Sequence, residues 1–168
     1  MTLWRPLKRS HWVITLAASS LALVLGVVEL RQATATAFDQ EYQGLERTRA
    51  AAHLAVYAGQ CTHDLRRVVT FFNRVAKARR AGLLSLDHEL RLFYDPIRWL
   101  AAWSNVAFQA CAPHDRYLFL ELRRESGVLL QARLRELAEN PHCQPPKPCF
   151  VADTLELYRE PDRTRRWL

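Results

Sequence analysis

The chain has 168 residues, of which 49% are hydrophobic and 24% are charged. This length allows one folded domain with a membrane anchor but not two separate cores, and the composition excludes wholesale disorder. The formal net charge is +7. Basic and acidic residues alternate through most of the chain, which is typical of solvated helix surface, so we expect no nucleic-acid partner.

The N-terminal segment carries the strongest pattern in the chain. From Ser10 to Val28, His11 is the only ionisable residue. As a helix, this run is about 28 Å long, which is enough to cross the hydrocarbon core of a bilayer. We therefore predict a single-pass transmembrane signal-anchor over residues 10–30. A buried core helix is disfavoured, because such helices seldom lack a charged face over this length.

Basic residues give this anchor a direction. Arg5, Lys8 and Arg9 precede the apolar run, and the positive-inside rule keeps such residues in the cytoplasm. We therefore expect a protein of the bacterial inner membrane with a cytoplasmic N-terminus and a periplasmic C-terminal domain. The alternative is a cleaved signal peptide, since the small residues at 33–37 offer a cleavage site near Ala37. Both interpretations export the domain.

Four cysteines support an oxidising location. An even set of cysteines in an exported domain is expected to form disulfides. Cys143 and Cys149 flank a proline-rich loop that holds them close together, which leaves Cys61 to pair with Cys111. Zinc is the alternative, with His142, Cys143 and Cys149 as ligands, but the spacing contains no CxxC pair and no evident fourth ligand. We therefore expect no metal site.

Helical spacing of apolar residues organises the remainder. A stripe without a phase break predicts one long helix from Phe38 to about Arg80, although Gly59 and Thr62 offer a place for a break. Gly82 and Ser85 predict a turn over 81–85. A second helix follows to about Cys111, with a kink or a fresh start at Pro96. A third helix is expected from about Arg116 to Glu139. The stripe of the first helix consists of Leu54, Tyr57, Cys61, Leu65, Val68, Phe72 and Val75.

The predicted fold is mainly α: a single N-terminal transmembrane helix, then an antiparallel three- or four-helix bundle with a disulfide-closed proline-rich loop. Along the chain, we expect a cytoplasmic basic start at 1–9, the anchor at 10–30, the exported helical domain at 31–160 and a basic flexible tail at 161–168.

Residues with chemical potential do not form a known catalytic pattern. Glycine-rich phosphate loops, HExxH and GxSxG are all absent. His63-Asp64 and Asp87-His88-Glu89 would form a metal site only if the first two helices paired differently, so we interpret the histidines as surface residues. Acidic residues that offer a carboxylate pair resemble ordinary surface charges, and the aromatic residues have the spacing of a helical core. The histidines in or beside predicted helices are His53, His63, His88 and His114; the acidic residues are Asp87, Glu121 and Glu125; the aromatic residues are Phe71, Phe72, Phe93, Tyr94, Trp99, Trp103 and Phe108.

We therefore predict no catalytic, cofactor or metal residues and no enzyme activity. The favoured function is that of a membrane-anchored periplasmic interaction protein, an accessory or structural component of an envelope assembly with a protein partner. The alternative is a periplasmic sensor or binding domain for a small molecule or metal, with Trp99, Trp103 and nearby histidines lining its pocket.

Overall fold

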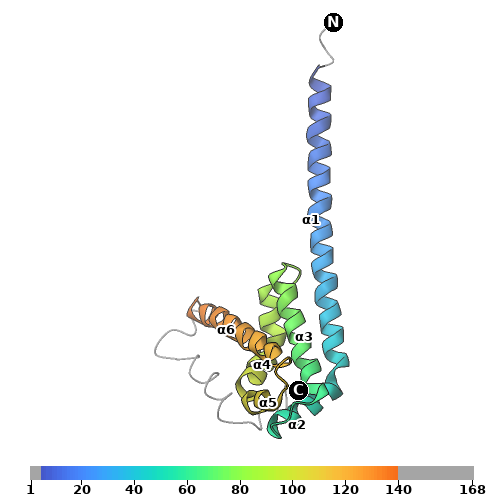
Figure 1. Ribbon diagram of the computed structural model, residues 1–168. Helices are drawn as coiled ribbons and strands as arrows, with labels where there is room; N and C mark the ends of the chain where they lie inside the picture. Colours follow the sequence, from blue (N-terminus) through green and yellow to red (C-terminus); the bar gives the residue numbers. More distant parts are fainter. Residues whose placement is uncertain (1–4, 140–168) are drawn as a thin grey trace.

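The computed structural model describes residues 5–139, and all regular structure in this range is helical (Figure 1). This confirms the predicted mainly α class for the described part of the chain. The six helices are α1 (Arg5–Gly44), α2 (Glu46–Tyr57), α3 (His63–Arg80), α4 (Leu86–Trp103), α5 (Asn105–Ala110) and α6 (Arg116–Glu139).

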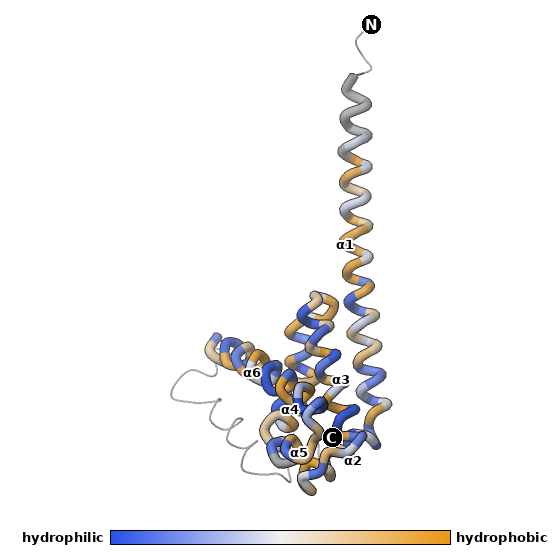
Figure 2. The backbone as a smooth tube through the Cα atoms, in the orientation of Figure 1, coloured by the Kyte–Doolittle hydropathy of each residue, from blue (hydrophilic) through white to orange (hydrophobic). Residues whose placement is uncertain are grey.

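Helix α1 has two parts with different surroundings. Its N-terminal part stands clear of the other helices and carries many apolar residues (Figures 1 and 2). Every side chain from Ile14 to Ala33 is exposed. The stretch Ile14–Gly44 is long and apolar enough to cross a membrane. The chain itself provides no described helix that covers this apolar surface.

The C-terminal part of α1 joins the domain. Phe38 is buried, and the ring of Tyr42 lies 5.3 Å from the Phe93 ring and 5.8 Å from the Phe71 ring. The guanidinium of Arg49, in α2, lies 3.9 Å from the centre of the Tyr42 ring. Aromatic burial thus fixes the end of α1 onto α3 and α4.

The single helix predicted from Phe38 to Arg80 is wrong. The chain leaves helical geometry at Leu45 and again after Tyr57, where Gly59 has a φ of 63°. Thr62 then caps α3 by accepting a hydrogen bond from the Leu65 backbone N–H at 3.2 Å.

The physical reason for the breaks is tertiary packing. By reversing at Gly59, the chain packs α2 against α3 and buries Ala52 and Val56. A continuous helix would leave these faces in water. Leu54, a member of the predicted stripe, is consequently 69% exposed.

Helices α3 and α4 form a hairpin (Figure 1). Its turn matches the prediction: Gly82 has a φ of 73°, and the Ser85 hydroxyl accepts a hydrogen bond from the His88 backbone N–H at 3.1 Å. Helix α4 continues through Pro96, so the predicted fresh start there is wrong. The chain instead breaks at Ser104, which is fully buried, and the short α5 follows.

Helix α6 has the predicted bounds and packs against α3 and α4. Leu122 and Leu129 are buried. The antiparallel three- or four-helix bundle predicted for the domain remains a prediction. The proline-rich loop between Cys143 and Cys149 and the tail at 161–168 lie outside the described residues. The largest buried side chains in the core are Phe71, Phe72, Phe93, Phe119, Leu65, Ile97, Leu100, Leu122 and Leu129.

Candidate functional site

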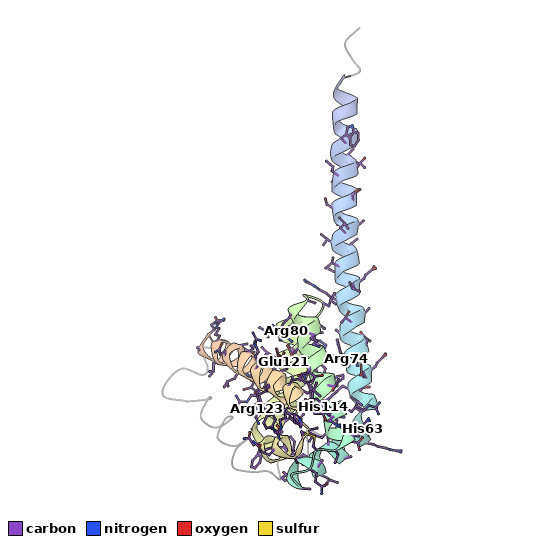
Figure 3. All side chains as sticks on the ribbon, viewed as in Figure 1. His63, Arg74, Arg80, His114, Glu121 and Arg123 are labelled. Carbon is purple, nitrogen blue, oxygen red and sulfur yellow. A yellow bond between two sulfur atoms is a disulfide. The ribbon has the colours of Figure 1, made fainter. Side chains whose placement is uncertain are left out.

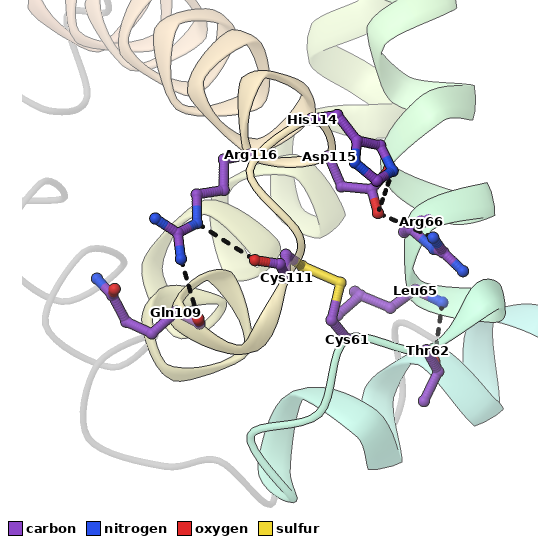
Figure 4. The surroundings of a disulfide bond; sticks show 9 residues. All are labelled: Cys61, Thr62, Leu65, Arg66, Gln109, Cys111, His114, Asp115 and Arg116. Carbon is purple, nitrogen blue, oxygen red and sulfur yellow. Dashed lines mark hydrogen bonds and ion pairs between the residues drawn. A yellow bond between two sulfur atoms is a disulfide. The ribbon is translucent and has the colours of Figure 1, made fainter.

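The predicted disulfide between Cys61 and Cys111 is present (Figure 4). Cys61 lies in the link between α2 and α3, and Cys111 directly follows α5; their Cα atoms are 5.0 Å apart. Because 50 positions separate the two cysteines, the bond joins parts of the fold that are distant in sequence. Disulfides of this kind are typical of proteins in oxidising compartments.

Polar contacts surround the disulfide (Figure 4). Arg66 in α3 pairs with Asp115 at 2.8 Å, and Nε2 of His114 lies 3.7 Å from the same carboxylate. Arg116 donates from Nε to the Cys111 carbonyl and from Nη2 to the Gln109 carbonyl, each at 3.3 Å. These contacts tie the start of α6 to α3 and α5. The arrangement is that of a structural brace.

A buried charge cluster lies where α3, α4 and α6 meet. Arg79 of α3 donates to Oε1 of Glu125, in α6, from Nη2 at 2.7 Å and from Nε at 3.0 Å. Nε of Arg79 also lies 2.7 Å from Oε2 of Glu89, in α4. The side chains of Glu89 and Glu125 are 0% and 2% exposed, whereas that of Arg79 is 18% exposed. One guanidinium therefore serves two buried carboxylates.

The two carboxylates are not held equally. The Arg79 N–H groups are directed at Glu125, and neither carboxylate oxygen of Glu89 accepts a hydrogen bond within the described part of the chain. Burial raises the pKa of Glu89 from its ordinary 4.5 to about 7, and the neighbouring Glu125 charge acts in the same direction, while Arg79 opposes both. The cluster is therefore able to hold a proton on Glu89 near neutral pH.

Sequence reasoning missed this cluster. The prediction that Glu125 is an ordinary surface charge is wrong. Glu121 and Asp87 do lie at the surface, with side chains 39% and 68% exposed. The available signal was helical phase. Glu125 falls between the buried Leu122 and Leu129, at the spacing of a core position.

The histidines lie in four separate places. His53 packs its ring 4.3 Å from that of Trp99, and Nε2 of His88 lies 3.0 Å from Oδ1 of Asp39. His63 and His114 are exposed (Figure 3). The His63-Asp64 and Asp87-His88-Glu89 motifs begin α3 and α4, so the hairpin places them at opposite ends. Within residues 5–139, no three His, Cys, Asp or Glu side chains are grouped to hold a metal. The zinc ligands considered at His142, Cys143 and Cys149 lie outside this range.

Most of the predicted aromatic core residues are buried. The rings of Phe71 and Phe72 are 5.2 Å apart, and that of Phe93 lies 5.8 Å from Phe71 in edge-to-face geometry. Trp99 is 4% exposed, while Trp103 is half-buried at the margin of the core. The prediction that Phe71, Phe72, Phe93 and Trp99 belong to the core is therefore confirmed.

The geometry thus offers three features: an exposed apolar helix, a disulfide brace and a buried proton-holding cluster. Comparisons with protein family models, with curated proteins and with solved structures found no match to this chain.

Proposed function

We propose that this chain is a membrane-anchored periplasmic helical interaction protein, an accessory or structural component of an envelope assembly. The observation that carries the proposal is α1, whose apolar and fully exposed N-terminal part continues directly into the disulfide-braced domain.

The exposed part of α1 supports a membrane anchor. Leu16, Leu21 and Leu23 are 65%, 61% and 72% exposed. Each such side chain gains roughly 2 kcal/mol on leaving water, so a helix that presents them on all sides is stable only in an apolar environment. A bilayer is the environment that matches both its length and its uniform apolar surface.

Two independent features support the direction of the anchor. Arg5, Lys8 and Arg9 precede the apolar run, as expected for a cytoplasmic end. The Cys61–Cys111 disulfide lies on the other side of that run, and structural disulfides persist outside the cytoplasm.

The surface of α6 supports a protein partner. Tyr117, Leu120 and Val128 are 60%, 55% and 37% exposed. Their spacing places them along one face of α6, away from the buried Leu122 and Leu129. The exposed Arg124 lies between Leu120 and Val128 on the same face. Apolar and aromatic side chains beside an arginine are typical of surfaces that bind partner proteins.

Membrane insertion is tested with charge substitutions in the full chain. Leu21→Arg with Leu25→Arg is expected to move the protein from the carbonate-resistant membrane fraction to the soluble fraction. The matched control, Leu92→Arg with Leu120→Arg on exposed domain surfaces, is expected to remain in the membrane. Protease added to spheroplasts should digest the domain. The proposal would be contradicted if carbonate extracted the unmodified chain from the membrane, or if the domain in spheroplasts were protected from the added protease.

The interaction role is tested with a photo-cross-linking residue at Leu120 in intact cells. A discrete adduct with another envelope protein is expected, and it should disappear when Tyr117 and Val128 are changed to serine. The same probe at Leu54, which is exposed on α2, is the control. Absence of any discrete adduct from α6 positions argues against this surface.

The alternative function, a sensor or binding domain for a small molecule or metal, remains a prediction. A bound ligand stabilises the folded state by mass action, so thermal-shift screening with metals and metabolites tests it directly.

A further inference from the structure

The turn of the α3–α4 hairpin lies against α1 close to the apolar segment. Nε of Arg31 donates a hydrogen bond to the Gly82 carbonyl at 2.8 Å. A Cβ atom added to Gly82 would lie 3.9 Å from Nη2 of Arg31. Figure 1 shows the hairpin running beside α1 with its turn toward the N-terminal part of α1. We refer to residues 81–86 as the hairpin tip.

The contact with Arg31 sets the depth of the hairpin tip. The apolar run ends at Val28, and three helical residues place Arg31 about 4.5 Å further along the axis. The headgroup layer on each side of the hydrocarbon core is roughly 5–8 Å thick. If α1 spans the membrane as proposed above, the Gly82 carbonyl lies at the depth of the lipid headgroups.

The chemistry of the hairpin tip fits that depth. Ala81 and Gly82 are exposed, and Leu86 is 39% exposed, so small and apolar groups face outward there. Arg31 and Lys77 are also exposed near the tip. The combination of apolar side chains and cations is the one that binds an interface of acyl chains and phosphates.

Two acidic residues near the hairpin tip are paired with other bases, while Glu29, two residues before Arg31 on α1, is exposed. Asp87 pairs with Arg91 at 3.0 Å. Glu121 pairs with Arg80 at 3.3 Å, and Figure 3 labels these two residues. Within the described part of the chain, Arg31 and Lys77 form no ion pair with a carboxylate. Their charges are therefore available to phosphate groups.

We propose that the hairpin tip is a lipid-contacting surface, in which Leu86 enters the headgroup layer while Arg31 and Lys77 bind the phosphates of anionic lipids. This inference rests on the proposed membrane anchor. The hairpin tip would then hold the domain on the bilayer through a second contact besides α1. Helix α2, which lies at the other end of α3, would be directed away from the membrane. Helix α3 has 18 residues, which separates its two ends by about 27 Å.

The test uses the full chain in nanodiscs of phosphatidylcholine and phosphatidylglycerol. A benzoylphenylalanine residue replaces Leu23, Leu86 or Leu54 in separate samples, and photo-adducts with phospholipid are measured by intact mass spectrometry. Adducts are expected at Leu23 and Leu86, in several-fold excess over Leu54, which lies in α2. Adducts at Leu23 with none at Leu86 overturn the lipid contact alone. Their absence at Leu23 overturns the anchor and with it this inference.

The role of the cations is tested in the same nanodiscs. Replacing phosphatidylcholine in part by phosphatidylglycerol is expected to raise the adduct yield at Leu86 several-fold. Arg31→Gln with Lys77→Gln should abolish this increase. The control, Arg47→Gln with Arg67→Gln, makes the same change in net charge at exposed positions far from the tip, and should retain it. An equal loss in both double variants, or no lipid dependence, overturns phosphate binding by Arg31 and Lys77.

Discussion

Arg79 binds Glu125 through two nitrogens, with Nη2 and Nε at 2.7 and 3.0 Å from the same carboxylate oxygen. This pair joins α3 to α6 in the interior. Glu89, also beside Arg79, is left without a hydrogen bond to either of its oxygens in the described part of the chain. Protonation of Glu89 balances the charge of this buried cluster, with Arg79 paired to an ionised Glu125.

The first prediction concerns pH. The pKa of Glu89 is about 7 in the folded chain against an ordinary 4.5, so the folded state binds the proton more tightly. The stabilising contribution is complete below pH 4.5 and is lost as the pH rises through 7, and it amounts to about 3 kcal/mol. Denaturant unfolding followed by circular dichroism in detergent, from pH 5 to 8, measures this decrease.

Glu89→Gln isolates the effect of this one group. Gln has the shape of the protonated acid and does not titrate, so this variant is expected to lack the part of the pH dependence that Glu89 contributes. Glu121→Gln, at a half-exposed surface carboxylate, should keep the slope of the unmodified chain. An unchanged slope in Glu89→Gln would contradict the raised pKa.

The second prediction concerns Arg79. Arg79→Leu removes the cation that both buried carboxylates face, and is expected to lower the free energy of unfolding at pH 8 by about 3–5 kcal/mol. Arg91→Leu removes a surface pair whose arginine side chain is 76% exposed, and should cost less than about 1 kcal/mol. The loss in Arg79→Leu should shrink at pH 5, because Glu89, whose pKa is about 7, is protonated there and no longer needs a cation. Similar losses in both variants would show that the cluster contributes little.

The third prediction concerns the disulfide. Cys61→Ser with Cys111→Ser is expected to lower the free energy of unfolding by about 4 kcal/mol, because the bond closes a long loop in the unfolded chain. Thermal unfolding with and without a reductant measures the effect. Reductant should lower the melting temperature of the unmodified chain. Any lowering that persists when Cys61 and Cys111 are both replaced by serine would come from Cys143 and Cys149.

The fourth prediction compares two glycines. Gly82 has a φ of 73°, a conformation that costs a side-chain-bearing residue about 1 kcal/mol, so Gly82→Ala should lower the melting temperature. Gly127 lies inside α6 with open space around its Cβ position, and Gly127→Ala should raise stability by up to about 1 kcal/mol. A melting temperature that is unchanged or raised in Gly82→Ala would contradict the assigned turn geometry.

Local signals in the sequence were sufficient for several elements. The turn at Gly82 and Ser85 was predictable, because a left-handed glycine and a side-chain cap act over a few residues. The bounds of α6 were also predictable, because the helix begins shortly after Pro113 and ends shortly before Pro141. The Cys61–Cys111 bond was predictable by elimination, because Cys143 and Cys149 flank one short proline-rich loop and leave these two cysteines to pair.

The break at Gly59 was not predictable from periodicity, because the apolar stripe from Leu54 to Val75 keeps its phase across it. What decides between one helix and three is the burial gained when α2 turns back onto α3, and this gain exists only when both helices are present. The spacing of apolar residues indicates which face of a helix is apolar, but it does not indicate which other helix packs against that face.

The apolar character of α1, the helical class and the turn at Gly82 and Ser85 were determined by the sequence alone, since each depends on neighbouring residues and on the solvent. Only the tertiary structure decided that Arg79, Glu89 and Glu125 share one buried site and that Arg31 meets Gly82. These groups are distant in the chain. Their interaction energies depend on burial and direction, which arise when the helices pack.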